Sequence, residues 1–201
     1  MRIAVYITSQ QKGFLISLGL AMTRRGHEVR VWARDRDVAR LVEKLAPELA
    51  PGMAVQAERT VEPDPAQAVQ LALEREELYG ATMAQLIAHD RALGKGYIFN
   101  ADRHPDIKRS WWGHERKLAA VLGLVMTWES LLDQDRPDVV IALNHLRDLS
   151  LVTESRGVRY FSLHPVRFGA RLMWSDDDYM TSTSLLADIR RFVEQPEPND
   201  Q

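Results

Sequence analysis

Cysteine is absent from the 201-residue chain, and its absence excludes several kinds of chemistry. Without thiols the protein has no disulfide bond, no zinc–cysteine centre, no iron–sulfur cluster and no cysteine nucleophile. The absence is compatible with a reducing compartment, and we expect a cytoplasmic protein. Long hydrophobic runs are missing too, since no stretch approaches the roughly 20 apolar residues that span a bilayer. We therefore expect a soluble protein, and peripheral contact with the inner face of a membrane stays open.

An excess of charge of one sign is also missing. The chain has 26 Lys and Arg against 28 Asp and Glu, which gives a formal net charge of -2. Proteins dedicated to nucleic acids usually carry a basic excess, so we expect no nucleic-acid partner. The six histidines are scattered, without the spacing of a metal-binding pair, and the Asp run at 176–178 lacks the alternation of a calcium loop. We therefore predict no metal site.

What the chain does contain is typical of a globular α/β domain. Hydrophobic residues make up 45% and charged residues 27%, as in ordinary globular proteins. Residues 3–7 form a short apolar run, a helical pattern follows and ends at Gly26, and residues 28–33 form a second β-rich run. Gly26 suits a left-handed helix end. Strand, helix and strand in this order predict two parallel neighbours joined by a right-handed crossover.

Further β-rich segments extend this pattern to a Rossmann-like, doubly wound parallel sheet of about five strands. The expected strands are residues 3–7, 28–33, 53–60, 138–143 and 158–163, in the order 3-2-1-4-5. A long helical insertion, about 66–135, lies between strands three and four. We expect one domain over residues 1–193, closed by a helix at 182–193, and a polar tail or linker at 194–201.

The first part of the insertion predicts one continuous helix over residues 66–93. Gly80 would lie inside this helix, and close packing against another element would explain a glycine there. Glu76 and Asp90 would share one apolar stripe. Fourteen residues of helix span about 21 Å, so we exclude these two carboxylates as a catalytic pair.

Ligands of open α/β sheets bind at the carboxyl ends of the strands, where the strand order reverses. Here that point lies between strands one and four, so residues 9–13 and 144–148 are expected to face each other. The predicted ligand-binding residues are Ser9, Gln10, Lys12, Gly13, Asn144, His164 and Arg167. Backbone N–H groups near Gly13 and the charge of Lys12 would hold an anion, and Arg167 would clamp a phosphate or carboxylate.

Proton transfer is assigned to a histidine, with His145 as the catalytic candidate and His164 as another. Structural alternatives stay open: either histidine can be a hydrogen-bonded structural residue, and Arg167 can pair with an acid. Arg147 and Asp148 are interpreted as a cap of the next helix. No Gly-x-Gly-x-x-Gly motif is present, so no dinucleotide cofactor is predicted.

A loop of aromatic and basic residues at 94–113 carries Trp111 and Trp112. Long loops inside compact domains are uncommon and often functional. The tryptophan pair has three interpretations: a lid on the core, a protein interface, or a platform on which a sugar ring stacks. We include both tryptophans among the predicted ligand-binding residues.

Several short motifs carry a resemblance to a known family. They are residues 2–7, Arg24-Arg25-Gly26-His27-Glu28-Val29, Glu77-Leu78-Tyr79-Gly80, Asp90-Arg91 and Arg136-Pro137-Asp138-Val139-Val140-Ile141, with a strand that closes before Arg167. Together they resemble the N-terminal domain of GT-B glycosyltransferases of bacterial capsule and surface-polysaccharide biosynthesis. The resemblance implies two Rossmann-like domains across a cleft, with no metal needed for the chemistry.

In such enzymes the N-terminal half holds the saccharide acceptor and the C-terminal half binds the nucleotide sugar. The chain departs from this pattern because it has no room for a second α/β domain after residue 163. Our main hypothesis is therefore the acceptor-side domain of such a transferase, inactive in isolation. Two alternatives stay open: a non-catalytic scaffold that forms a homodimer through its helical insertion, and a small enzyme with a nucleotide-sized ligand.

Overall fold

The structure is a computed structural model that describes residues 1–90, 93–94, 112–165, 172–176, 187, 190, 191 and 194. One six-stranded sheet forms its centre, in the order β3-β2-β1-β4-β5-β6. The strands are β1 (Arg2–Ile7), β2 (Glu28–Ala33), β3 (Ala54–Val55), β4 (Val139–Leu143), β5 (Arg159–Pro165) and β6 (Leu172–Ser175). Strands β1 to β5 pair in parallel, which confirms the predicted order. The antiparallel edge strand β6 was not predicted.

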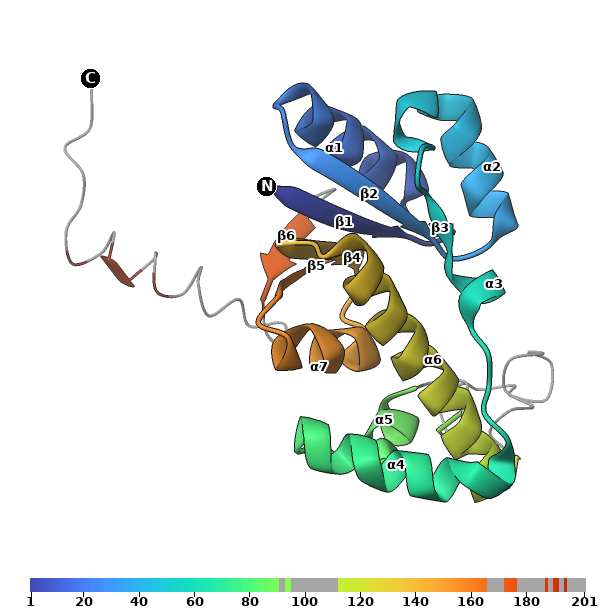
Figure 1. Ribbon diagram of the computed structural model, residues 1–201. Helices are drawn as coiled ribbons and strands as arrows, with labels where there is room; N and C mark the ends of the chain where they lie inside the picture. The colour runs from blue at the N-terminus through green and yellow to red at the C-terminus, as the bar shows by residue number, and fades with distance from the viewer. Residues whose placement is uncertain are drawn as a thin grey trace.

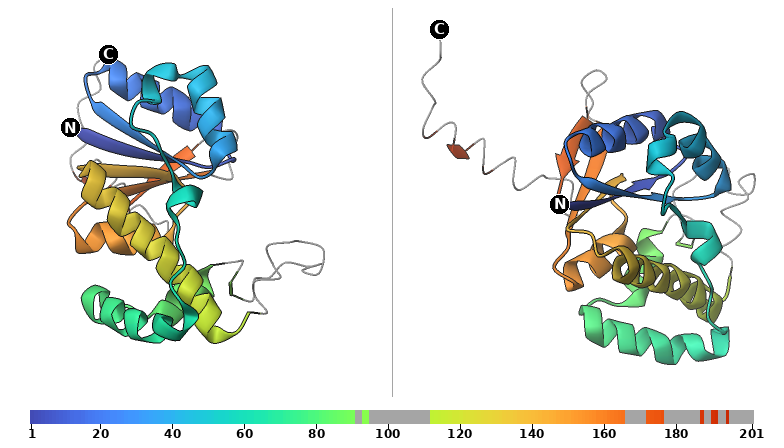
Figure 2. Two further views of the ribbon diagram at one scale, coloured as in Figure 1. Left: turned by 45° about the vertical axis from the view of Figure 1, so that its right-hand side comes forward. Right: turned by 45° about the horizontal axis from the view of Figure 1, so that its top comes forward.

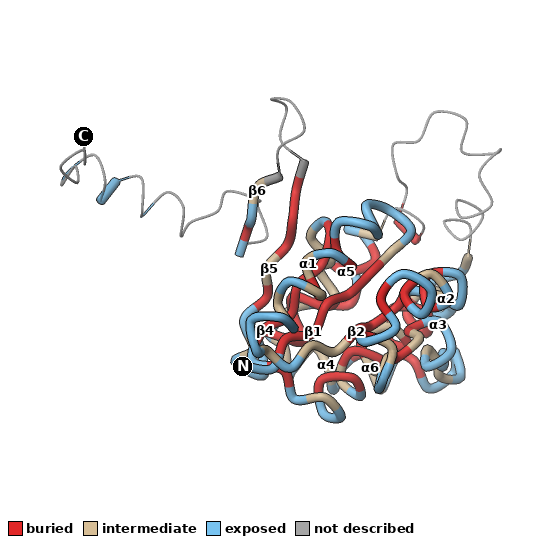
Figure 3. Tube along the Cα trace, turned by 90° about the horizontal axis from the view of Figure 1, so that it is seen from above, coloured by how far each residue is buried: buried red, intermediate tan, exposed pale blue. Residues whose placement is uncertain are grey.

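Helices cover both faces of the sheet (Figures 1 and 2). Helices α1 (Lys12–Arg24) and α2 (Arg36–Leu45) lie on one face, and α6 (His114–Asp135) and α7 (Arg147–Ser155) lie on the other. Strand β1 alternates between two cores: Val5 faces the α1 side, whereas Tyr6 faces the α6 side. Buried residues consequently follow the central strands, as the red segments of Figure 3 show. Burial on both faces is what makes these strands almost wholly apolar.

The helix of the first crossover, α1, ends just before Gly26, as the sequence predicts. Gly26 has a φ of 81°, and its N–H donates to the carbonyl of Thr23 at 2.9 Å. The N–H of His27 donates to the carbonyl of Met22 at 3.2 Å. These two bonds form a Schellman motif, which turns the chain directly into β2.

The third predicted strand, 53–60, is wrong for most of its length. Only Ala54–Val55 pairs with β2, after the short helix η1 (Pro47–Leu49), and the chain then forms α3 (Gln56–Arg59). The N–H and the hydroxyl of Thr60 both donate to the carbonyl of Gln56. β3 is an edge strand, so only β2 pairs with it. The backbone of residues 56–60 therefore forms its hydrogen bonds locally, within a helical turn, instead of with a second strand.

The predicted continuous helix 66–93 is two helices, α4 (Pro65–Tyr79) and α5 (Met83–His89). Gly80 ends α4 with a φ of 63°, and no other part of the protein comes within 4 Å of the position that a Cβ would take there. The prediction of close packing at Gly80 is therefore wrong. A glycine is found here because the backbone is left-handed. Thr82 and Gln85 start α5 with a capping box.

The break also removes the straight helix on which we based the distance between Glu76 and Asp90. Each of the two carboxylates caps a backbone amide: Glu76 accepts from Met83 at 2.7 Å, and Asp90 accepts from Leu93 at 2.9 Å. These bonds assign both residues to the termini of α4 and α5.

The insertion lies between β3 and β4, as predicted, and α6 is its main element. The C-terminal half of α6 packs under the sheet, where Trp128 contacts Tyr6 and Trp32. Its N-terminal half extends beyond the sheet and carries α4 and α5 (Figure 1). A methyl group on Gly123 would lie 3.1 Å from the carbonyl oxygen of Val61, so the chain leaving α3 crosses α6 closely there. The predicted helix 182–193 and the tail 194–201 fall largely outside the described residues.

Candidate functional site

The carboxyl ends of β1 and β4 lie side by side, as the sequence analysis requires. Tyr6 of β1 is in register with Ala142 of β4, so the segments that follow both strands leave the same edge of the sheet. The side-chain amide of Asn144 donates to the amide oxygen of Gln10 at 3.4 Å. The two predicted loops therefore form one continuous edge, which we call the carboxyl edge (residues 8–13 and 144–148).

The first loop leads into α1 without a side-chain cap. Gln11 is the N-cap residue and has a left-handed backbone with a φ of 46°. The amide of Leu15 is the first to reach back to the carbonyl of Gln11, at 3.2 Å. The preceding N–H groups, from Lys12 to Phe14, therefore have no partner inside the helix. Ser9, Gln10, Lys12 and Gly13 are exposed here, so this helix start is open to an anion or to a polar ligand.

The second loop is fixed by Tyr160 of β5. The hydroxyl of Tyr160 donates to the carbonyl of Asn144 at 3.2 Å and accepts from the amide of Leu146 at 3.1 Å. Asn144 has a left-handed backbone, with a φ of 61°. The ring of His145 stands edge-on to that of Tyr160, with 5.5 Å between the ring centres. Tyr160 thus holds the ring of His145 beneath the carboxyl edge, where both ring nitrogens are shielded from solvent.

Asp148, which the sequence indicated only as part of a helix cap, is a candidate for proton transfer. Its carboxylate accepts a hydrogen bond from the indole N–H of Trp128 at 2.7 Å, in the first turn of α7. Burial raises the pKa of Asp148, hydrogen bonds from the Trp128 indole and the Leu149 amide oppose that rise, and the charge of Asp90 adds to it. A carboxyl that holds its proton to higher pH than usual is suited to proton transfer.

The earlier interpretation of Arg147 and Asp148 as a helix cap needs correction. The N-cap residue of α7 is Leu146, which has no side-chain cap, and Asp148 lies inside the first turn. Its main partner, Trp128, lies 20 residues earlier on α6. Sequence spacing carries no signal for such a contact, because only the packing of α6 under the sheet brings the indole to α7.

Tyr6 completes the group beneath the carboxyl edge. It is 5% exposed, and its ring packs edge-on against Trp128 with 5.1 Å between the centres. Burial raises the pKa of Tyr6 far above its usual range; the charge of Arg34 opposes this rise and that of Asp148 adds to it. The phenol is therefore neutral at every physiological pH.

His164 lies on β5 directly after Leu163, whose carbonyl accepts a hydrogen bond from the amide of Asn144 at 2.9 Å, so His164 is next to the loop that follows β4. It is buried on β5 opposite Met173 of β6, and its Nε2 lies 2.7 Å from the hydroxyl oxygen of Ser162. That hydroxyl also donates to the carbonyl of Ser175 at 3.3 Å. These contacts favour the structural interpretation of His164 as a residue that joins β5 to β6.

The remaining predicted residues lie in or beside the aromatic loop and after β5. Arg167 and Trp111 lie outside the described residues. Trp112 packs against the core, and the guanidinium carbon of Arg116 lies 3.9 Å from the centre of its ring. Since one face of Trp112 is covered by a cation, its contacts favour the lid interpretation over an open sugar platform.

Chemically, the carboxyl edge combines an open helix start, an amide pair, an imidazole and a carboxyl with a raised pKa. Such a set can orient a polyhydroxylated ligand and remove one of its protons. Among the residues that the structure describes, no three His, Asp or Glu side chains gather as metal ligands would. None of the described helices combines the length and the apolar character that crossing a membrane takes.

The sheet order, the crossovers and the loops at the switch point define a Rossmann-like, doubly wound α/β domain. No protein-family model and no curated protein matches the chain. Among solved structures it is similar to the glycosyltransferase SsfS6 of Streptomyces sp. SF2575, at 20% identity and a TM-score of 0.38, over 81% of this chain and 38% of that one.

A second structure of SsfS6, complexed with thymidine diphosphate, gives the same values. The chain is also similar to the glycosyltransferase VinC in complex with DTDP, at 14% identity and a TM-score of 0.35, over 80% of this chain and 33% of that one. The chain thus spans well under half the length of either protein. At these identities the likeness concerns the fold alone.

Proposed function

We propose that the chain is the acceptor-side domain of a glycosyltransferase that acts in bacterial surface-polysaccharide biosynthesis. The observation that carries the proposal is the junction of the β1 and β4 loops, marked by the hydrogen bond between Asn144 and Gln10. The resemblance of the sequence motifs supplies the reaction and the pathway. The nucleotide sugar would be bound mainly by a second domain.

The proposed reaction is an attack by an acceptor hydroxyl on the anomeric carbon of the donor sugar. As the new C–O bond forms, the bond from that carbon to the diphosphate breaks, and the diphosphate leaves with the electron pair. The hydroxyl proton passes to His145, whose ring Tyr160 holds in place and whose buried nitrogens the acceptor must uncover as it binds. The open helix start at Lys12 faces the negative charge that develops on the leaving group. Asp148, in the first turn of α7, is the second group able to hold a proton.

The test is a calorimetric titration of the whole chain with two sets of probes. One set is di- and trisaccharides of glucose, galactose and N-acetylglucosamine; the other is nucleoside diphosphate sugars. We expect a saccharide to bind, and the triple variant Lys12→Ala/Asn144→Ala/His145→Ala to bind it at least about tenfold more weakly. The matched control His27→Ala/Lys44→Ala lies away from the carboxyl edge and should bind as the parent does. Unchanged binding by the triple variant would contradict the assignment.

A scaffold that dimerises through the insertion is the second candidate, and one observation favours it. Val69 and Leu73, four residues apart on one face of α4, are 47% and 57% exposed. Neighbouring apolar side chains that stay exposed on a helix are typical of an interface. Light scattering separates the two hypotheses: a dimer that Leu73→Glu converts to a monomer supports the scaffold, and a monomer at high concentration excludes it.

A further inference from the structure

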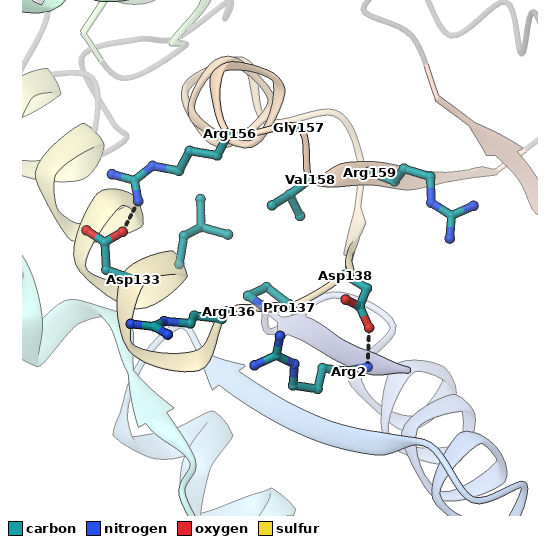
Figure 4. A pocket seen from close by; sticks show the side chains of 10 residues that line it. Arg2, Asp133, Arg136, Pro137, Asp138, Arg156, Gly157, Val158 and Arg159 are labelled. Atoms are coloured by element: carbon teal, nitrogen blue, oxygen red, sulfur yellow. Dashed lines mark hydrogen bonds and ion pairs between the residues drawn. The ribbon is translucent and has the colours of Figure 1, made fainter.

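A hollow lies at the opposite edge of the sheet from the candidate site. Its volume is about 610 Å³, and it opens where β1, β4 and β5 begin. Four arginines, Arg2, Arg136, Arg156 and Arg159, line it, and apolar atoms of Pro137 and Val158 lie between them (Figure 4). Pockets of this volume commonly hold small molecules. Nothing in the proposed transfer reaction uses this edge.

The fold itself brings these cations together. Arg2 and Arg159 lie at the first positions of β1 and β5, and parallel strands begin at the same edge of a sheet. Arg136 and Arg156 are the C-cap residues of α6 and α7. Both helices therefore end at the hollow, and their C-terminal dipoles favour cations there.

Part of this positive charge is already compensated. Arg156 forms an ion pair with Asp133, and the carboxylate of Asp138 accepts a hydrogen bond from the backbone amide of Arg2 at 2.7 Å (Figure 4). Among the described residues, no carboxylate pairs with the guanidinium of Arg2 or of Arg136. The four arginines and the two aspartates of the hollow sum to a net charge of about +2. The C-terminal ends of the two helices each contribute about half a negative charge, which lowers the net charge to about +1.

Arg136 also has a left-handed backbone, with a φ of 44°. Glycine or asparagine is usual in this conformation at a helix end, because other side chains are strained there. The position is therefore occupied by a residue that backbone geometry disfavours, and this residue is one of those that line the hollow. Strained residues of this kind tend to gather at binding sites.

We propose that this hollow binds an organic phosphate, with the phosphate between Arg2 and Arg136 and a less polar body over Pro137 and Val158. Guanidinium groups bind phosphate oxygens through paired hydrogen bonds, which suits arginine better than lysine. A surplus of about one positive charge offsets part of the charge of a single phosphate group, about −1.5 to −2 at neutral pH, and is too small for a long polyanion. The phosphate can come from a soluble ester or from a lipid headgroup.

The experiment uses the whole chain and three probes: phenyl phosphate, inorganic pyrophosphate and vesicles that contain phosphatidic acid. We expect phenyl phosphate to bind more tightly than pyrophosphate, because only phenyl phosphate has an apolar body. The double variant Arg2→Gln/Arg136→Gln should bind at least about fivefold more weakly. The matched control is Arg25→Gln, since Arg25 is the exposed C-cap residue of α1.

A second variant separates binding from folding. Arg136→Gly removes the guanidinium and relieves the left-handed backbone, so it should weaken phosphate binding while the chain is at least as stable in urea as the parent. Loss of vesicle binding in the same variants assigns the phosphate to a lipid, and loss for the soluble probe alone assigns it to a free ester. No binding of any probe, or equal weakening by Arg25→Gln, overturns the proposal. None of these outcomes depends on saccharide binding at the carboxyl edge.

Discussion

Replacing Asp148 by asparagine should stabilise the chain at neutral pH. The carboxyl has a raised pKa, so the folded chain binds its proton more tightly than the unfolded chain does. Stability therefore falls as the pH rises from the ordinary value of 3.8 through the raised pKa, and this loss is complete above it. Each unit of pKa elevation corresponds to about 1.4 kcal/mol of lost stability. The amide of the variant would keep an acceptor for the Trp128 indole and would bury no charge.

The assay is urea unfolding of the parent and Asp148→Asn at several pH values between 4 and 8. The difference in the free energy of unfolding should be close to zero in acid and should grow in favour of the variant as the pH rises. Asp37→Asn, on the exposed side of α2, is the matched control and should show no such trend. A variant that is less stable by the same amount at every pH would refute the reasoning, because the carboxyl would then contribute by its shape and hydrogen bond alone.

Three further perturbations test other parts of the structure. Gly80→Ala should lower the free energy of unfolding by about 1 kcal/mol, because alanine is strained at a φ of 63°, whereas Gly13→Ala in α1 should not; thermal unfolding compares the two. Asp35→Ala should lower the free energy of unfolding in urea by about 1 kcal/mol, because the Asp35 carboxylate caps α2 by accepting a hydrogen bond from the amide of Val38. An unchanged free energy of unfolding would contradict this cap. Tyr160→Phe removes both hydrogen bonds that fix residues 144–146, so it should lower the free energy of unfolding by about 1–2 kcal/mol and weaken saccharide binding. Hydrogen exchange of the backbone amides of residues 144–146 should become faster.

The parallel core of the fold is predictable because its signals are local. Three signals determine β1, β2, β4 and their order: apolar runs, a glycine with a left-handed backbone after the first helix, and the rule for right-handed crossovers. The errors fall where tertiary context decides. The strand predicted at 53–60 is too long because β3 lies at the edge of the sheet, where the backbone can form local hydrogen bonds instead. The helix predicted at 66–93 hides a break at Gly80 because the residues around this helix end have the composition of a helix interior. Strand β6, Leu172–Ser175, was not predicted; it pairs only with β5, at the edge of the sheet.

The candidate site was predictable in position and not in all of its members. The adjacency of β1 and β4 follows from the sheet order, so the loops of Gln10 and Asn144 could be placed together in advance. The role of Asp148 depends on Trp128, a contact between two helices that no motif encodes. The interpretation of Trp112 likewise depends on Arg116, which packs on its ring. Contacts of this kind are set by how helices pack, and residue type alone does not determine them.

The central claim is that the loops after β1 and β4 form one saccharide-binding edge. Amide chemical shifts of the isotope-labelled chain, recorded during titration with the acceptor oligosaccharides, test it most directly. We predict that residues 9–13 and 144–148 shift together and saturate at the same ligand concentration. Shifts confined to α4 or to the arginine-lined hollow, with both loops unchanged at saturation, would contradict the account.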